Sequence, residues 1–296
     1  MIWLIGCKGM LGTEVSNQFD KNNFEWIGTD REVDITDYES LKAFASKYCD
    51  SDKKIDWIVN CAAYTAVDKA EEDVELATKL NALGPKNIAT LCKEINAKMI
   101  HISTDYVFDG SATNPYTEDM NYKPLGVYGV TKADGEKAVL ETIPDASYVI
   151  RTAWLYGNYG KNFVFTMINL MNTKEKISVV NDQFGTPTNA SNLANVICTI
   201  INKSELENIP TGIYHCTDLG QTNWYEFAKK IHHLGIKYGK ITGNCVVNPC
   251  TTEEYPVKAK RPAYSVLSKD KLMKNLNINL PDWKENLENF IKNLEV

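Results

Sequence analysis

The chain has 296 residues, 44% of them hydrophobic, which is enough apolar material for one large domain or two coupled ones. Its net charge of -6 and isoelectric point near 5.4 argue against a DNA or RNA ligand, because nucleic-acid phosphates attract basic proteins. The first residues form a strand pattern and no apolar run reaches about 18 residues, so we expect no signal peptide, no membrane span and a cytoplasmic protein.

The chain opens as a strand, a glycine turn and a helix. Met1–Ile5 is apolar, Gly6, Gly9 and Gly12 follow it, and residues 10–20 carry apolar side chains at helical spacing. Such glycines let the backbone approach a pyrophosphate, and the helix N-terminus offers N–H groups to its charge. The pattern predicts a dinucleotide site; the alternative is a plain helix-entry turn.

The second predicted strand, Phe24–Gly28, leads to Asp30. A carboxylate at this point of a nucleotide-binding fold binds the ribose hydroxyls of an adenine dinucleotide and repels a 2′-phosphate, which favours NADH. Arg31 and Lys8 could offset that repulsion, so we expect weak discrimination between NADH and NADPH. The alternative role of Asp30 is that of a turn residue at the strand end.

Strands and helices then alternate through the first half of the chain. Near-continuous apolar strands separated by helices are typical of a parallel sheet covered on both faces. The predicted fold class is therefore α/β, a doubly wound (Rossmann) parallel sheet with a second, smaller lobe. The further predicted strands are Ile55–Val59, Lys98–Ile102 and Tyr148–Arg151, and the further helices cover 38–49, 71–95 and 128–142.

The pattern loosens after residue 153. Ala190–Asn202 is predicted as a helix and Gly212–Cys216 as a strand, so we expect the chain to return once to the sheet. The expected division is a dinucleotide-binding domain at 1–153 with a returning segment at 189–217, and a substrate-binding lobe made of 154–188 and 218–296.

The chemistry is expected at the end of the fourth strand. Thr104 ends that strand, and Tyr128 and Lys132 lie four residues apart on one face of the following helix. An ammonium group beside a phenol lowers the phenol pKa, which would make Tyr128 a usable general acid. The same spacing occurs at Tyr38/Lys42 and Tyr225/Lys229, which we interpret as ordinary helix-surface pairs.

These motifs together resemble the extended short-chain dehydrogenase/reductase superfamily. Within it, the chain is similar to the dTDP-4-dehydrorhamnose reductase family in several separated blocks that include the substrate lobe. The blocks are Asn60–Glu71, Ser103–Gly110, Arg151–Gly157, Asn181–Thr188 and Arg261–Ser265.

The resemblance implies NAD(P)H-dependent reduction of the 4-keto group of dTDP-4-dehydro-L-rhamnose to dTDP-L-rhamnose. In that reaction Tyr128 would donate a proton, Lys132 would hold the nicotinamide ribose and tune Tyr128, and Thr104 would orient the same oxygen. Thr104 replaces the serine that is commoner in the superfamily and keeps the hydroxyl. The expected cofactor contacts are Gly6, Gly9, Met10, Leu11, Gly12, Asp30, Arg31, Asp34, Ile35, Ala62, Ala63, Tyr64, Tyr128 and Lys132.

Substrate contacts are expected from Thr104, Asp105, Trp154 and Arg261. The resemblance assigns the sugar to Thr104, Asp105 and Trp154. We assign the substrate diphosphate to Arg261, because a planar guanidinium binds a diphosphate in a bidentate manner. The alternative for Arg261 is a surface salt bridge, and we expect Arg151 to be structural. Tyr64 stands where the family usually has a histidine.

No metal site is predicted. The eight cysteines form no C-x-x-C pair and the four histidines have no zinc-ligand spacing, so we expect buried, reduced thiols. Some members of the family carry an interfacial Mg²⁺ held by carboxylates, but Thr188–Asn192 has none. A homodimer is expected only on family grounds.

Two alternatives differ in class. One is reduction or epimerisation of another nucleotide-linked 4-keto sugar. The other is a non-catalytic, dinucleotide-binding regulatory subunit, like that of methionine adenosyltransferase. Retention of Thr104, Tyr128 and Lys132 favours an enzyme over a regulatory subunit.

Overall fold

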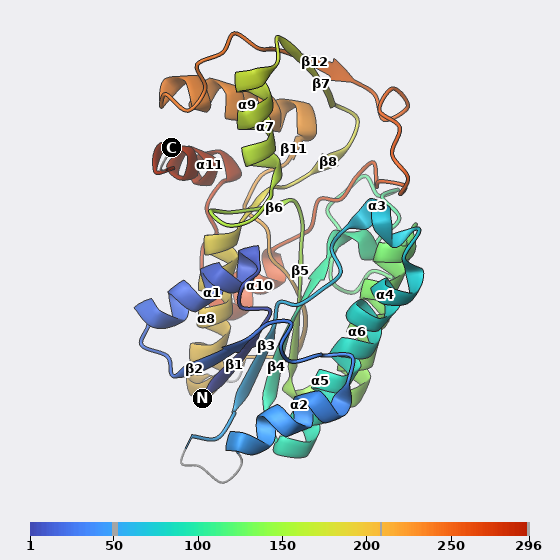
Figure 1. Cartoon of the computed structure of the whole chain (residues 1–296), viewed down its shortest axis with the longest axis vertical. Helices are drawn as coiled ribbons and strands as arrows, with labels where there is room; N and C mark the ends of the chain where they lie inside the picture. The colour runs from blue at the N-terminus through green and yellow to red at the C-terminus, as the bar shows by residue number, and fades with distance from the viewer. Residues whose placement is uncertain (49–52, 208, 295–296) are drawn as a thin grey trace.

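The computed structural model describes residues 1–48, 53–207 and 209–294. Six parallel strands form the central sheet in the order β10-β5-β4-β3-β1-β2 (Figure 1). β2 and β3 flank β1 on opposite sides, and at such a reversal a ligand crevice opens beyond the carboxyl ends of the strands. The predicted α/β fold is confirmed. The strands are β1 (Ile2–Ile5), β2 (Trp26–Thr29), β3 (Trp57–Asn60), β4 (Lys98–Thr104), β5 (Ser147–Thr152) and β10 (Gly212–His215).

Helices cover both faces of the sheet (Figure 1). Within β1, Ile2 and Leu4 join one buried cluster while Trp3 and Ile5 join another, because successive side chains of a strand point to opposite faces. The first cluster includes α1 and α8, and the second includes α2 and α5. The helices on the first face are α1 (Met10–Lys21), α8 (Ala190–Leu206) and α10 (Asp270–Leu276), and those on the second are α2 (Tyr38–Ala45), α5 (Gly84–Ile95) and α6 (Val127–Thr142).

Two predicted helices differ from the structure. The segment 38–49 is α2 followed by a 3₁₀ turn, η1 (Ser46–Tyr48), and residue 49 lies outside the described residues. The segment 71–95 is divided by a π-helical turn, and its centre, Asn81, is fully buried and bonded to the backbone of Tyr64. Helical periodicity does not reveal this hydrogen bonding of Asn81 to Tyr64, so the prediction of one continuous helix over 71–95 was wrong. The elements in this region are α3 (Val67–Ala70), α4 (Val74–Thr78), η2 (Lys79–Leu83) and α5.

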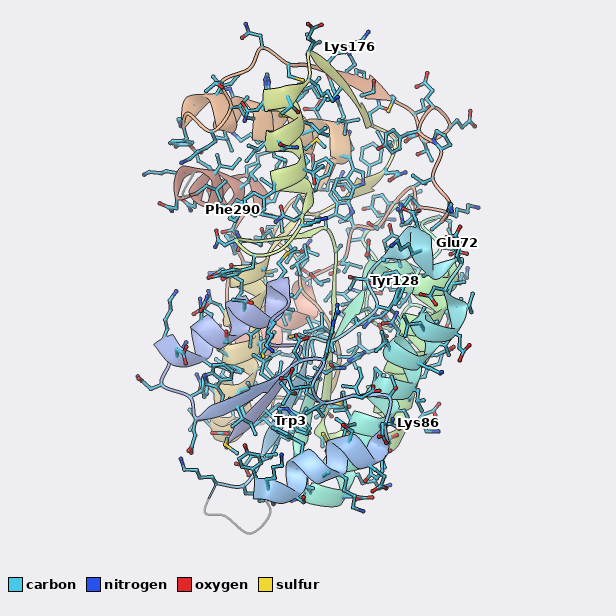
Figure 2. All side chains as sticks on the ribbon, viewed as in Figure 1. Trp3, Glu72, Lys86, Tyr128, Lys176 and Phe290 are labelled. Atoms are coloured by element: carbon cyan, nitrogen blue, oxygen red, sulfur yellow. The ribbon has the colours of Figure 1, made fainter. Side chains whose placement is uncertain are left out.

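A third cluster of buried side chains lies above the carboxyl ends of the strands, at the top of Figure 1. Phe227 and Phe290 belong to it, and Figure 2 labels Phe290 on α11. Its helices are α7 (Phe163–Thr173), α9 (Trp224–Lys237) and α11 (Trp283–Lys292). Its short strand pairs are β6 (Leu155–Tyr156) with β9 (Thr188–Asn189), β7 (Lys176–Val180) with β12 (Val246–Cys250), and β8 (Phe184–Gly185) with β11 (Thr222–Asn223). The remaining 3₁₀ turns are η3 (Asp105–Val107) and η4 (Pro144–Ala146).

Within the described ranges, no helix is long and apolar enough to cross a membrane. All the cysteines that the structure describes, which exclude Cys49, are free thiols. Among the same residues, no three His, Cys, Asp or Glu side chains gather as a metal would need.

Candidate active site

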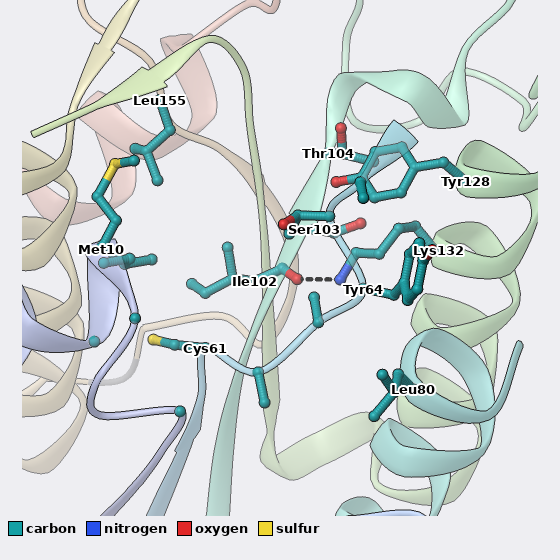
Figure 3. Close-up of a pocket in the computed structure, with 18 of the residues that line it drawn as sticks. Met10, Cys61, Tyr64, Leu80, Ile102, Ser103, Thr104, Tyr128, Lys132 and Leu155 are labelled. Carbon is teal, nitrogen blue, oxygen red and sulfur yellow. Dashed lines mark hydrogen bonds between the residues drawn. The ribbon is translucent and has the colours of Figure 1, made fainter. Parts of the chain in front are cut away.

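A cavity of about 1020 Å³ lies beyond the carboxyl ends of β1, β3, β4 and β5 (Figure 3). Of the predicted site residues, Arg261 alone does not line it. The predicted residues that do are Gly6, Gly9, Met10, Leu11, Gly12, Asp30, Arg31, Asp34, Ile35, Ala62, Ala63, Tyr64, Thr104, Asp105, Tyr128, Lys132 and Trp154.

The glycine turn forms the floor of the cavity where α1 begins. Gly6 has a φ of 78°, and a Cβ atom on it would lie 2.8 Å from the backbone nitrogen of Ala62. A Cβ on Gly12 would lie 2.0 Å from the carbonyl oxygen of Gly6. Gly9 is the N-cap of α1 and provides no side-chain cap, so the first N–H groups of the helix are free to bind an anion.

Asp30 follows β2 at the edge of the cavity. Its carboxylate accepts hydrogen bonds from the backbone N–H groups of Lys8, at 3.2 Å, and Arg31, at 2.9 Å. The Lys8 ammonium pairs instead with Glu32, at 3.4 Å, and Lys8 does not line the cavity. Of the two cations expected to offset Asp30, only Arg31 lies at the cavity.

Helix α6 carries Tyr128 and Lys132 toward the end of β4 (Figure 3). The Lys132 Nζ donates a hydrogen bond to the carbonyl oxygen of Ile102, at 2.6 Å. Thr104 Oγ1 donates to Asp105 Oδ1, at 2.9 Å, and the Tyr128 ring packs edge-on against Tyr106 with the centroids 5.4 Å apart. The phenol, the ammonium and the hydroxyl therefore share one wall.

Burial controls the protonation of this wall. Burial raises the pKa of Tyr128 above its ordinary value, and a hydrogen bond with Thr104 opposes this only in part. Burial also lowers the pKa of Lys132 to about 8, while the Glu136 carboxylate opposes that shift. The predicted lowering of the Tyr128 pKa is therefore wrong, because desolvation and the charge of Asp105 raise it more than the hydrogen bond with Thr104 lowers it. Tyr128 is a protonated phenol at neutral pH.

The other two Tyr-x-x-x-Lys pairs are surface contacts, as predicted. The Nζ of Lys42 lies 5.8 Å from the ring centroid of Tyr38 on α2, and the Nζ of Lys229 lies 5.2 Å from that of Tyr225 on α9. None of these residues lines the cavity.

Two predicted substrate residues have unusual surroundings. Asp105 is only 2% exposed, and burial raises its pKa to about 6 although hydroxyl groups of Ser265 and Thr104 oppose the shift. Trp154 has a φ of 49°, which is strained for a bulky residue, and its ring stacks on Trp224 at 3.6 Å. Trp154 thus joins the cavity to the third cluster.

Arg261 lies just outside the cavity wall. Its Nη2 pairs with Asp68 Oδ2, at 2.6 Å, and its guanidinium carbon lies 6.0 Å from the ring centroid of Tyr106, a lining residue. Nη1 is buried without a hydrogen-bond partner. Arg261 therefore forms the ion pair named as the alternative and keeps unused donor capacity. Arg151 is fully buried and paired with Glu136, as expected of a structural residue.

Asn81 does not line the cavity but holds Tyr64, which does, and the sequence did not reveal it. Its Oδ1 accepts from the N–H of Tyr64, at 2.8 Å, and its Nδ2 donates to the carbonyl of Tyr64, at 3.1 Å, and to Thr131 Oγ1, at 3.2 Å. Asn81 therefore holds the backbone of Tyr64, a lining residue, against Thr131 of α6. A polar residue among helix-forming ones was the only available sign.

Thr188–Asn192 is the stretch at which some members of the family carry Mg²⁺, and two of its asparagines make hydrogen bonds within the protein. Asn189 caps α8 by accepting from the N–H of Ser191, at 2.9 Å, and Asn192 Nδ2 donates to Asp218 Oδ1, at 2.8 Å.

The whole chain, residues 1–296, matches the family described as the RmlD substrate binding domain. The chain belongs to this family. A related dTDP-4-dehydrorhamnose reductase from Streptomyces griseus is 39% identical over 272 residues, which make up 91% of this chain and 86% of that protein.

Two solved structures extend the likeness of this RmlD-family chain to three dimensions. The dTDP-4-dehydrorhamnose reductase of Clostridium acetobutylicum gives a TM-score of 0.89 at 43% identity, and the match covers 98% of both chains. The Bacillus anthracis dTDP-4-dehydrorhamnose reductase in complex with NADP gives a TM-score of 0.88 at 36% identity, covering 98% of this chain and 97% of that one.

Proposed function

We propose that this chain reduces the 4-keto group of dTDP-4-dehydro-L-rhamnose to dTDP-L-rhamnose with NADPH or NADH. One observation carries the proposal: Thr104, Tyr128 and Lys132 share one wall of the cavity that the glycine turn opens. The relatives named as dTDP-4-dehydrorhamnose reductases support the choice of sugar.

The cavity suits a nicotinamide dinucleotide. Gly6, Gly9 and Gly12 line the cavity at the uncapped N-terminus of α1, whose N–H groups would bind a pyrophosphate, and Asp30 and Arg31 line it where the adenosine ribose would lie. The name of the Bacillus anthracis structure, a complex with NADP, supports this assignment. A bound reduced nicotinamide supplies a hydride to the ketone carbon.

The side chains of this wall protonate and orient the 4-keto oxygen of the substrate. Tyr128, protonated because it is buried, donates its proton as the alkoxide develops, and Thr104 holds the same oxygen in line. Lys132, still charged below about pH 8, holds the ribose and stabilises the phenolate that remains. Together these groups lower the cost of placing negative charge in a buried site.

Substrate contacts complete the proposal. We assign the sugar to Asp105 and Trp154 and the diphosphate to Arg261. Two observations support Arg261: its buried Nη1 has no hydrogen-bond partner, and its guanidinium carbon lies 6.0 Å from the ring centroid of Tyr106, which lines the cavity. Segments 154–188 and 218–296 would then form the substrate-binding lobe, except that α10 packs against the sheet with the dinucleotide-binding domain, made of 1–153 and 189–217.

Replacement of Tyr128 by Phe tests the function. Tyr128→Phe should reduce turnover of the keto-sugar by roughly 10² to 10⁴-fold, the usual value of a positioned proton donor, and should leave dinucleotide binding intact. Tyr225→Phe, in the surface pair with the same spacing, is the matched control and should keep full turnover.

Each other result has a meaning. Retained turnover in Tyr128→Phe would assign the proton donor to another group. Turnover by the wild type of a different nucleotide-linked 4-keto sugar would keep the chemistry and change the substrate. Dinucleotide binding without any turnover would favour a regulatory subunit.

A further inference from the structure

A buried ion pair lies directly behind the catalytic wall. Glu136 follows Lys132 by one turn of α6, and Arg151 reaches it from β5. Arg151 Nη2 donates to Glu136 Oε2, at 2.8 Å, and Arg151 Nε donates to Oε1, at 3.0 Å. Both side chains are completely buried, and neither lines the cavity.

The Glu136 carboxylate also binds two hydroxyl groups. Ser103 Oγ donates to Oε1, and Tyr122 OH donates to Oε2, at 2.9 Å. Ser103 directly precedes Thr104 and pairs with Arg151 in the sheet. One carboxylate therefore ties α6 to β4, to β5 and to the loop that carries Tyr122.

The tie to β4 continues the contact made by Lys132. Lys132 donates a hydrogen bond to the carbonyl of Ile102. Glu136, one helical turn further along α6, accepts a hydrogen bond from the hydroxyl of Ser103. The next residue of β4 is Thr104, which faces Tyr128 at the start of the same helix. The separation of Tyr128 from Thr104 therefore depends on how α6 sits against this strand end.

We infer that Glu136 is a positioning residue for the proposed reduction: it holds the end of β4 against α6 so that Thr104 and Tyr128 meet the same substrate oxygen. Arg151 balances its charge. This role rests on the proposed function. A buried pair adds little stability relative to well-packed apolar residues, so fold stability alone does not require it.

The test combines two variants with a matched control. Glu136→Gln combined with Arg151→Met removes both charges together and leaves no unpaired buried ion. Ser103→Ala removes the hydroxyl bond to Glu136. Because Ser103 also lines the cavity, a loss of kcat counts for the positioning role only if NADPH affinity and KM for the sugar nucleotide stay at their wild-type values. Tyr148→Phe is the control, because it also removes one buried hydroxyl bond from the sheet, the 3.0 Å bond to the carbonyl of Ile209, away from α6.

If Thr104 and Tyr128 are displaced in the variants, the chemical step should slow while NADPH binding stays unchanged. We expect kcat to fall roughly 10²-fold in the double variant, the cost of about 1 Å of misplacement, and about tenfold in Ser103→Ala. NADPH affinity should stay constant. With NADPH deuterated at the transferred position, the isotope effect on kcat should increase in both variants and stay at the wild-type value in Tyr148→Phe.

The outcomes separate the two proposals. A Ser103→Ala protein with wild-type kcat and isotope effect would overturn the positioning role, even if the double variant fails to fold. A fall in activity that follows the folded fraction, with an unchanged isotope effect, would also overturn it. A wild type that does not reduce the sugar would refute the proposed function and the role of Glu136 in it.

Discussion

We expect Asp30 to set the preference between NADH and NADPH. Its carboxylate lies at the cavity edge, where it would repel a 2′-phosphate. Asp30→Ala should therefore raise the kcat/KM ratio of NADPH to NADH by about tenfold, equivalent to roughly 1.4 kcal/mol. Asp20→Ala, which removes the same charge from a residue that does not line the cavity, should leave the ratio unchanged. An unchanged ratio in Asp30→Ala would make Asp30 only a turn residue.

We expect Lys132 to set the alkaline limit of the reaction. Burial lowers the pKa of Lys132 from 10.5 to about 8, so its ammonium form is lost as the pH rises through about 8. We expect kcat/KM for the dinucleotide, which reports the free enzyme, to be maximal below that pH and to fall above it.

Stability measurements separate this effect from unfolding. Because the folded pKa of Lys132 lies below its unfolded value, the unfolded chain binds more protons between about pH 8 and 10.5. The contribution of Lys132 to stability therefore increases with pH in that range. A decline of activity that coincides with loss of the circular dichroism signal would contradict the assignment to Lys132.

At the scale of elements, Asn81 in the π-helical turn η2 links the backbone of Tyr64 to α6 by hydrogen bonds. Asn81→Ala removes the bonds to both backbone groups of Tyr64, and this should lower the free energy of unfolding by about 1–3 kcal/mol and weaken NADPH binding. Calorimetry and fluorescence titration measure the two effects.

Asn172 provides the control for Asn81. Its Nδ2 donates a hydrogen bond to the carbonyl of Lys240 and its Oδ1 accepts one from the N–H of Thr242, each at 2.9 Å. Asn172 does not line the cavity. Asn172→Ala should lose stability but keep NADPH affinity. Equal NADPH affinity in both variants would remove Asn81 from the binding machinery.

The elements also show what the sequence could predict. The strands of the sheet were found because each is a short apolar run, although β2 begins two residues later than Phe24. The π turn at Asn81 and the strained backbone of Trp154 were missed, because both depend on contacts between distant segments. The predicted direction of the Tyr128 pKa shift was wrong for the same reason, because burial raises this pKa and depends on the whole fold.

At the scale of the molecule, two ion pairs join the loop between β12 and α10 to α3 and the turn that follows it. Arg261 pairs with Asp68, and Lys258 pairs with Glu72, so one loop of the carboxyl-terminal half is held against α3 and the turn that follows it. The predicted diphosphate site therefore lies at a junction between distant segments of the chain.

Arg261→Lys tests that site. Lysine keeps the charge but loses the planar fork, so KM for the sugar nucleotide should rise about tenfold while NADPH affinity stays constant. Lys258→Ala removes the neighbouring exposed pair and should leave KM unchanged. If both variants keep the wild-type KM, Arg261 is a structural ion-pair residue.

The most direct test of the central claim is hydride transfer itself. Wild-type protein, dTDP-4-dehydro-L-rhamnose and NADPH deuterated at the transferred position should give dTDP-L-rhamnose with deuterium at the sugar C4 atom, one for each NADPH oxidised. NADPH that binds but is not oxidised, or deuterium at any other carbon, would contradict the account.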